Sequence, residues 1–272
     1  MRKLLLVLVT LASTSWAGIT YTAVTRTIVD KKNHAADMRV RAWVEGKQVR
    51  IDFVESSLSE LESGTYLVST DGGDTSYLVD PKSKTYQRFD INAMVGNMAD
   101  LMRAMRSQMK VHFEEPKVEK LLDEVGPKMA GLPTHHYRYR TSYKEYLELY
   151  ETETISTVLE EDIWTTTAIA QPELMALLNK HASSGDEQLD RIIQKEMEKV
   201  PGFPLKRITS THTETNKSTT ESLTEMEIVE LKTVPVTSSM FKVPKDFTQL
   251  DPNDSDLANA LKKLEKKKKQ DQ

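Results

Sequence analysis

Histidine is the residue type in this chain best suited to metal binding or acid–base chemistry, and two histidines, His135 and His136, are adjacent. Neighbouring residues of a strand point to opposite faces, so these two side chains cannot hold one ion together. The other histidines show no metal-ligand spacing, and the absence of cysteine excludes thiol catalysis and cysteine-based zinc sites. The sequence also lacks a G-x-S-x-G elbow, a glycine-rich phosphate loop and an H-E-x-x-H motif. We therefore expect a protein that is not an enzyme and uses no metal or cofactor.

A stripe of methionines between Met94 and Met109 is the strongest signal for ligand binding. Methionine is flexible and polarisable, so it suits a surface that accepts varied apolar ligands, and for the same reason it fills the core behind a packed helix. The apolar sides of two strands expected at 38–45 and 48–53 line either a cavity or a filled core. The candidate ligand-binding residues are Val40, Ala42, Val49, Ile51, Phe53, Met94, Met98, Met102 and Met105.

The elements that must position these residues are mainly strands. Residues 38–45 and 48–53 alternate between apolar and polar, which predicts a hairpin around Gly46 and Lys47. The polar side of this hairpin carries Arg39, Arg41 and Arg50, which are exposed to solvent or meet anionic groups of a partner. Further strands are expected at 66–70, 75–80, 85–89, 134–141, 155–170, 205–215 and 218–234.

Helices are expected at 90–109, where apolar residues recur at i, i+3 and i+4, and at 172–200, which opens with Pro172. Residues 117–128 have no clear pattern, and residues 142–154 fit either a helix or a long hairpin tip. Because strands and helices do not alternate as in βαβ units, the pattern predicts an α+β protein with one antiparallel sheet and helices on one face.

The amino terminus predicts export. Arg2 and Lys3 precede the apolar run 4–12, and the small residues Ser15 and Ala17 follow, which is the order of a cleavable signal peptide. We expect a signal peptide at 1–17, a single domain at 18–250 and a polar linker with a lysine-rich tail at 251–272. The mature protein is then periplasmic and not lipid-anchored.

Charge limits the choice of partners. The formal net charge is −4, and six lysines lie within residues 257–272, so the rest of the chain is acidic and unsuited to nucleic acid. The lysine-rich tail either makes peripheral contact with an anionic membrane or is a solvated end.

Four stretches resemble proteins of the LolA/LolB-like superfamily and the uncharacterised secreted bacterial families related to it. They are residues 46–53 (G-x-x-x-R), residues 67–86 (ending in D-P-x-x-K-x-Y), residues 126–137 and residues 241–247 (F-x-V-P-x-x-F). The resemblance implies a curved antiparallel half-barrel with helices covering the concave face. It also implies an apolar concave face that shelters acyl chains, as in the lipoprotein carriers.

Together these observations predict a periplasmic carrier that holds an apolar or amphiphilic ligand with an acyl chain between sheet and helices. Its expected partner is a lipid or an acylated protein. The alternative is a non-enzymatic cell-envelope interaction protein with a filled core, which binds a protein partner through its charged face.

Overall fold

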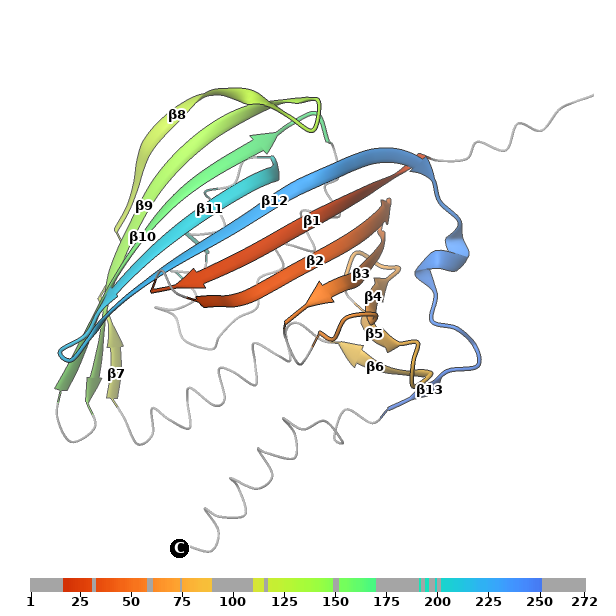
Figure 1. Cartoon of the computed structure of the whole chain (residues 1–272), viewed down its shortest axis with the longest axis horizontal. Helices are drawn as coiled ribbons and strands as arrows, with labels where there is room; N and C mark the ends of the chain where they lie inside the picture. Colours follow the sequence, from red (N-terminus) through yellow and green to blue (C-terminus); the bar gives the residue numbers. More distant parts are fainter. Residues whose placement is uncertain are drawn as a thin grey trace, which may run out of the picture.

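The computed structural model describes residues 17–30, 33–57, 61–73, 75–89, 110–114, 117–148, 152–169, 191, 194–195, 199 and 202–250. These residues form one open 13-stranded sheet (Figure 1). Its strands are β1 (Ala17–Val29), β2 (Asn33–Glu45), β3 (Gln48–Ser56), β4 (Tyr66–Ser69), β5 (Ser76–Asp80), β6 (Thr85–Phe89), β7 (Lys110–Phe113), β8 (Lys117–Met129), β9 (Leu132–Glu148), β10 (Thr152–Thr166), β11 (Phe203–Glu214), β12 (Thr219–Pro235) and β13 (Thr248–Gln249). Residues 236–250, which contain the 3-10 helix η1 (Ser238–Phe241) and β13, form the C-terminal strap.

The sheet follows the order β13-β6-β5-β4-β3-β2-β1-β12-β11-β10-β9-β7, and β8 also pairs with β9. Strand β13 pairs with β6 in parallel, whereas the other pairings are antiparallel. Because β1 pairs with β12, an early and a late part of the sequence lie side by side in the middle of the sheet (Figure 1).

The expected hairpins are present. In the β2–β3 hairpin, Val44 pairs with Val49 and Ala42 with Ile51, so the apolar sides of the two strands coincide. Gly46 in its turn has a φ of 54°, a left-handed conformation that glycine adopts without steric cost. The hairpins β4–β5, β5–β6 and β11–β12 also lie where the sequence predicted them.

The expected α+β class, with helices covering the concave face, is wrong. Within the described ranges the protein is almost entirely strand, in one large open mixed sheet; only residues 191 and 194–195 are helical there, and no described helix of the expected length covers a face. Residues 117–128 lie in β8, residues 142–148 form the end of β9 and residues 152–154 the start of β10, where Glu148 pairs with Thr152. Residues 142–148 contain Tyr143 and Tyr146, and aromatic residues favour strands. Residues 117–128 have little strand propensity of their own, and their pairing with β9 places them in the sheet. The expected helix at 90–109 and most of that at 172–200 lie outside the described residues.

The main core covers one face of the sheet. Its buried members come from five strands and are Tyr21, Ala23, Ala42, Val44, Val49, Phe203, Leu205 and Ile228, here named the apolar face. A second cluster, formed by Tyr66, Val68 and Val79, packs against Val243 and Phe247 of the strap. Among the described residues, no helix has the length and apolar character needed to cross a membrane.

Candidate functional site

The C-terminal strap is held against β3–β6 at both of its ends. The Arg50 guanidinium lies 3.9 Å from the centroid of the Tyr66 ring, and its Nη1 donates to the carbonyl oxygen of Met240 at 3.3 Å. At the other end, the Leu250 amide donates to the Tyr86 carbonyl oxygen at 2.8 Å. Figure 1 shows the strap, in blue, running from β12 to the edge of the sheet at β6. The strap therefore extends the sheet and covers part of it.

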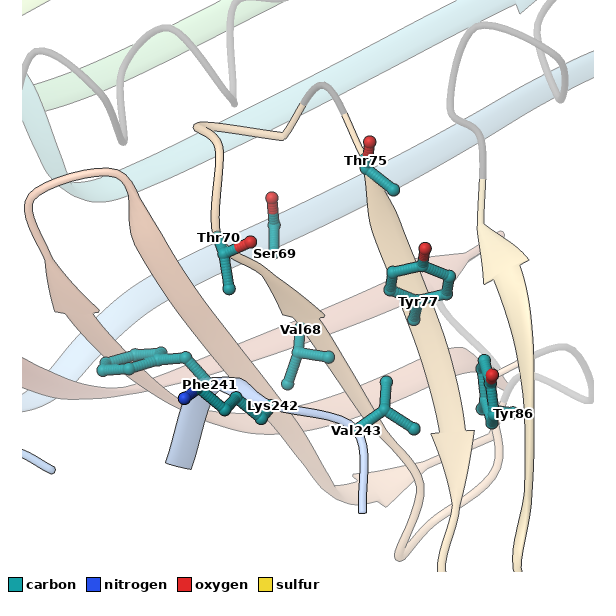
Figure 2. Close-up of a pocket in the computed structure, with 9 residues that line it drawn as sticks. All are labelled: Val68, Ser69, Thr70, Thr75, Tyr77, Tyr86, Phe241, Lys242 and Val243. Atoms are coloured by element: carbon teal, nitrogen blue, oxygen red, sulfur yellow. The ribbon is translucent and has the colours of Figure 1, made fainter. Parts of the chain in front are cut away.

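Between the strap and strands β4–β6 lies a cleft of about 290 Å³ (Figure 2). Figure 2 shows that the lining differs between its two ends. Val68, Phe241 and Val243 give the end beside the strap its apolar surface, and Tyr86 and Lys242 also lie at this end. The hydroxyl end lies beside the turn between β4 and β5. The hydroxyl end consists of Ser69, Thr70, Thr75 and Tyr77. The cleft is therefore amphipathic.

The turn beside the hydroxyl end is fixed by Asp71. Its Oδ1 accepts hydrogen bonds from the Ser69 hydroxyl at 3.0 Å and from the Thr75 amide at 2.8 Å, and the Gly73 amide donates to the Ser69 hydroxyl at 2.9 Å. Partial burial opposes ionisation of Asp71, but the hydrogen bonds from Thr75 and Ser69 outweigh it, so its pKa lies below the ordinary value. Gly72 and Gly73 have φ values of 77° and 90°, which explains why the turn needs two glycines.

The predicted ligand-binding residues of β2 and β3 lie together, but outside this cleft. Ala42 and Val49 are fully buried, at 0% exposure, and Phe53 is 6% exposed. Val40 and Ile51 are partly buried and pack against the apolar face. These five predicted residues of β2 and β3 therefore belong to a packed core. The predicted methionines, Met94, Met98, Met102 and Met105, lie outside the described residues.

The arginines on the opposite side of β2 and β3 have partners within the chain. Arg39 Nε lies 3.5 Å from a Glu55 carboxylate oxygen, and Arg50 Nε lies 2.7 Å from Asp52 Oδ1. Arg50 also contacts Tyr66 and the strap, so its role here is to hold the strap in place.

The adjacent histidines lie on opposite faces of β9, as strand geometry predicted. His135 Nε2 lies 2.5 Å from Asp123, whereas His136 Nε2 lies 2.6 Å from Asp162. The His136 ring stacks on Trp164 with a centroid distance of 4.3 Å. These contacts join β8, β9 and β10, which is a structural role. Within the described residues, no group of three potential ligands could hold a metal ion.

Two stretches of the sequence form part of the cleft, but their residues were not among the predicted ligand-binding residues. The D-P-x-x-K-x-Y and F-x-V-P-x-x-F stretches lie far apart in the chain, yet they meet at this site. Lys84 Nζ lies 3.4 Å from Asp246 Oδ2, and Tyr86 and Phe247 pack around the same cluster. Nothing in either stretch alone indicates that it faces the other.

Comparison with protein-family models matches residues 27–247 to a domain of unknown function, DUF4412. A search of curated proteins gave no match. Among solved structures, a similar chain is that of the "Structure of PNGF-II in C2 space group", with 10% sequence identity and a TM-score of 0.29. The match covers 86% of this chain and spans 31% of the length of that chain. The expectation of an uncharacterised family is thus confirmed, whereas no relationship to the LolA/LolB superfamily is shown. Since the family model matches most of its length, this chain belongs to the DUF4412 family.

Proposed function

We propose that this DUF4412 protein is a periplasmic binding protein that carries an apolar or amphiphilic ligand with an acyl chain. The amphipathic cleft between the strap and β4–β6 is the observation that supports the proposal most directly. Its volume of about 290 Å³ lies near the lower end for small-molecule pockets, which is roughly 300 Å³. The cleft therefore suits one chain and its head group.

The energetics of chain burial agree with such a ligand. Burying each CH₂ group contributes about 0.8 kcal/mol, so a chain of about eight carbons contributes roughly 6 kcal/mol. This corresponds to a dissociation constant no lower than roughly 20 μM from the chain alone. Polar contacts of the head group would add to this affinity and orient the ligand.

We propose binding without chemistry. The Ser69 hydroxyl is hydrogen-bonded to Asp71 and to the Gly73 amide, which holds it in the turn. Among the described residues that line the cleft, there is no histidine to activate a nucleophile. The arrangement favours recognition of a ligand over its conversion.

The cellular part of the proposal follows from the sequence. The amino-terminal pattern at 1–17 supports export, and the periplasm is the compartment in which a carrier of lipid or acylated protein would act. The lysine-rich tail would add peripheral contact with an anionic membrane, at about 1 kcal/mol per lysine near the surface.

The proposal is tested by purifying the exported protein from periplasm without detergent, followed by native mass spectrometry and lipid extraction. We expect a discrete added mass that extracts as a lipid. Val243→Trp should fill the apolar end of the cleft and abolish the added mass. Val54→Trp, on β3 at a residue 43% exposed, serves as the matched control and should retain the ligand.

Circular dichroism of both variants checks that the fold is intact. A clean ligand-free mass for the wild type under several growth conditions would contradict the proposal, as would an unchanged bound mass in Val243→Trp.

One observation favours the alternative, an envelope interaction protein. Strand β8 lies at the edge of the sheet and exposes Val125 at 84% and Leu121 at 43%. Exposed apolar residues on an edge strand are suited to contact with another protein. Cross-linking of a ligand-free protein to one partner through β8 would support this alternative.

A further inference from the structure

The hydroxyl end of the cleft holds polar groups that are available to a ligand. Thr70 is exposed and Tyr77 is half-buried, and within the described part of the chain neither hydroxyl forms a hydrogen bond. Figure 2 shows both side chains at the same end as Ser69 and Thr75. A hydroxyl both donates and accepts, so these groups match a polar head that carries a hydroxyl or carbonyl oxygen.

No charged side chain is among the described residues that line this end of the cleft. Asp71 does not line it, and its Oδ1 accepts hydrogen bonds from the Ser69 hydroxyl and the Thr75 amide within the turn. Lys242 lines the cleft from the strap, and Figure 2 shows its ammonium group directed away from Thr75 and Tyr77. An ionised head placed at the hydroxyl end would lose hydration without gaining an opposite charge, which is unfavourable.

We propose that the cleft selects single-chain amphiphiles whose head is uncharged and bears a hydroxyl or carbonyl oxygen, and that it discriminates against ionised heads. The chain lies against Val68, Phe241 and Val243, and the head contacts Thr70 and Tyr77. This inference rests on the proposed function, because it assumes that the cleft binds an amphiphile.

Three ligands with one chain and different heads test the inference: octan-1-ol, octanoate and octylammonium. Each is titrated at pH 7 into the full chain and followed by ligand-observed NMR. We expect octan-1-ol to bind at least about tenfold more tightly than either ion, which corresponds to the cost of removing one charge from water without a partner.

Variants of the cleft-lining residues test whether the hydroxyl end causes the tighter binding of octan-1-ol. Thr70→Val and Tyr77→Phe keep the shape of the side chains and remove their hydroxyls. Each should weaken octan-1-ol binding by about 2- to 10-fold, the usual range for one hydrogen bond, and leave the weak binding of the two ions unchanged. Lys245→Met, at an exposed residue of the strap outside the cleft lining, is the matched control and should leave the affinity for octan-1-ol unchanged.

The outcomes separate this inference from the proposed function. If octanoate binds as tightly as octan-1-ol and loses affinity in Lys242→Met, the head is an anion held by the strap, and the inference is overturned while the carrier proposal stands. If Thr70→Val and Tyr77→Phe both leave octan-1-ol binding unchanged, the head lies elsewhere and the inference again fails. If none of the three ligands binds, the proposed function fails and the inference with it.

Discussion

Asp80 holds the β5–β6 turn, on which one wall of the cleft depends. Its Oδ1 accepts a hydrogen bond from the Lys82 amide at 2.8 Å, and its Oδ2 accepts one from the Ser83 hydroxyl at 2.6 Å. The hydrogen bond from Ser83 is the main cause that lowers the pKa of Asp80 below its ordinary value, although partial burial opposes it. Lys84, in the same turn, has a φ of 55°.

Asp80→Asn should therefore destabilise the protein in a pH-dependent way. Because the pKa is lower in the folded state than in the unfolded state, the ionised carboxylate stabilises the fold above about pH 4, and this contribution declines as the pH falls further. We expect a loss of about 1 kcal/mol in the free energy of unfolding at pH 7, measured by urea denaturation. The difference from wild type should shrink below about pH 4. An equal difference at pH 7 and pH 3 would show that the charge of Asp80 is not involved.

The alternation of apolar and polar residues along a strand correctly predicted which residues share a face of the sheet. Val40 and Ala42 lie on one side of β2 and Arg39 and Arg41 on the other, because successive side chains of a strand must point in opposite directions. The contact of Arg50 with Met240 could not be predicted. It joins residues 190 positions apart, and no pattern within β3 indicates what covers that strand.

At the scale of elements, the parallel pairing of β13 with β6 places the end of the strap. The pairing is short, with Thr248 beside Thr85 and Gln249 beside Tyr86. Parallel partners that are distant in the sequence leave no turn signal, so this element could not be predicted. Hairpins behave differently, since turn residues such as those at 46–47 indicated both their place and their partners.

A disulfide between positions 85 and 248 tests whether the strap closes the cleft. The chain contains no cysteine, so Thr85→Cys/Thr248→Cys can form only one intramolecular bridge. Neighbouring strands bring Cα atoms within the usual range for a disulfide, about 4.4–6.8 Å. We expect the oxidised variant to gain about 2–4 kcal/mol in stability and to exchange bound ligand more slowly.

The reduced double variant and each single variant are the controls, and they should behave as wild type. Failure of the two thiols to form a bridge under oxidising conditions would place the strap elsewhere. Unchanged ligand exchange in the oxidised form would mean that the ligand enters without movement of the strap.

At the scale of the whole molecule, pairing between distant segments sets the order of the strands. β1 pairs with both β2 and β12, so the two halves of the open sheet join only when residues 17–29 meet residues 219–235. Bringing such distant segments together lowers the conformational entropy of the chain before their contacts can compensate for it. No local feature of the sequence indicates which segments will pair. This explains why the strands could be predicted better than the sheet order. Residues 117–128, which have no clear pattern, and residues 142–148, which also fitted a helix, both joined the sheet, so the described protein has far more strand than the α+β class implied.

A buried ion pair ties residue 199 to the far half of this sheet. Lys199 Nζ donates to Glu161 Oε2 at 2.6 Å and to the Thr141 hydroxyl. Lys199 is 3% exposed, Glu161 4% and Thr141 0%. Arg207 Nη1 lies 3.9 Å from the other carboxylate oxygen of Glu161, Oε1. The Lys199 contacts span β9 and β10, so they fix the position of residue 199 on the sheet.

Lys199→Met should destabilise the whole protein, because it removes the ammonium group that pairs with the buried Glu161 carboxylate. Breaking a buried pair in this way costs about 3 kcal/mol, and the nearby Arg207 keeps the loss from being larger. In Lys199→Met/Glu161→Leu, both charges are replaced by apolar groups, and most of the stability should return. Urea denaturation of the two single variants, the double variant and wild type gives the coupling energy. If the two single losses simply add in the double variant, Lys199 and Glu161 are not coupled, and residue 199 must be held to the sheet by other contacts.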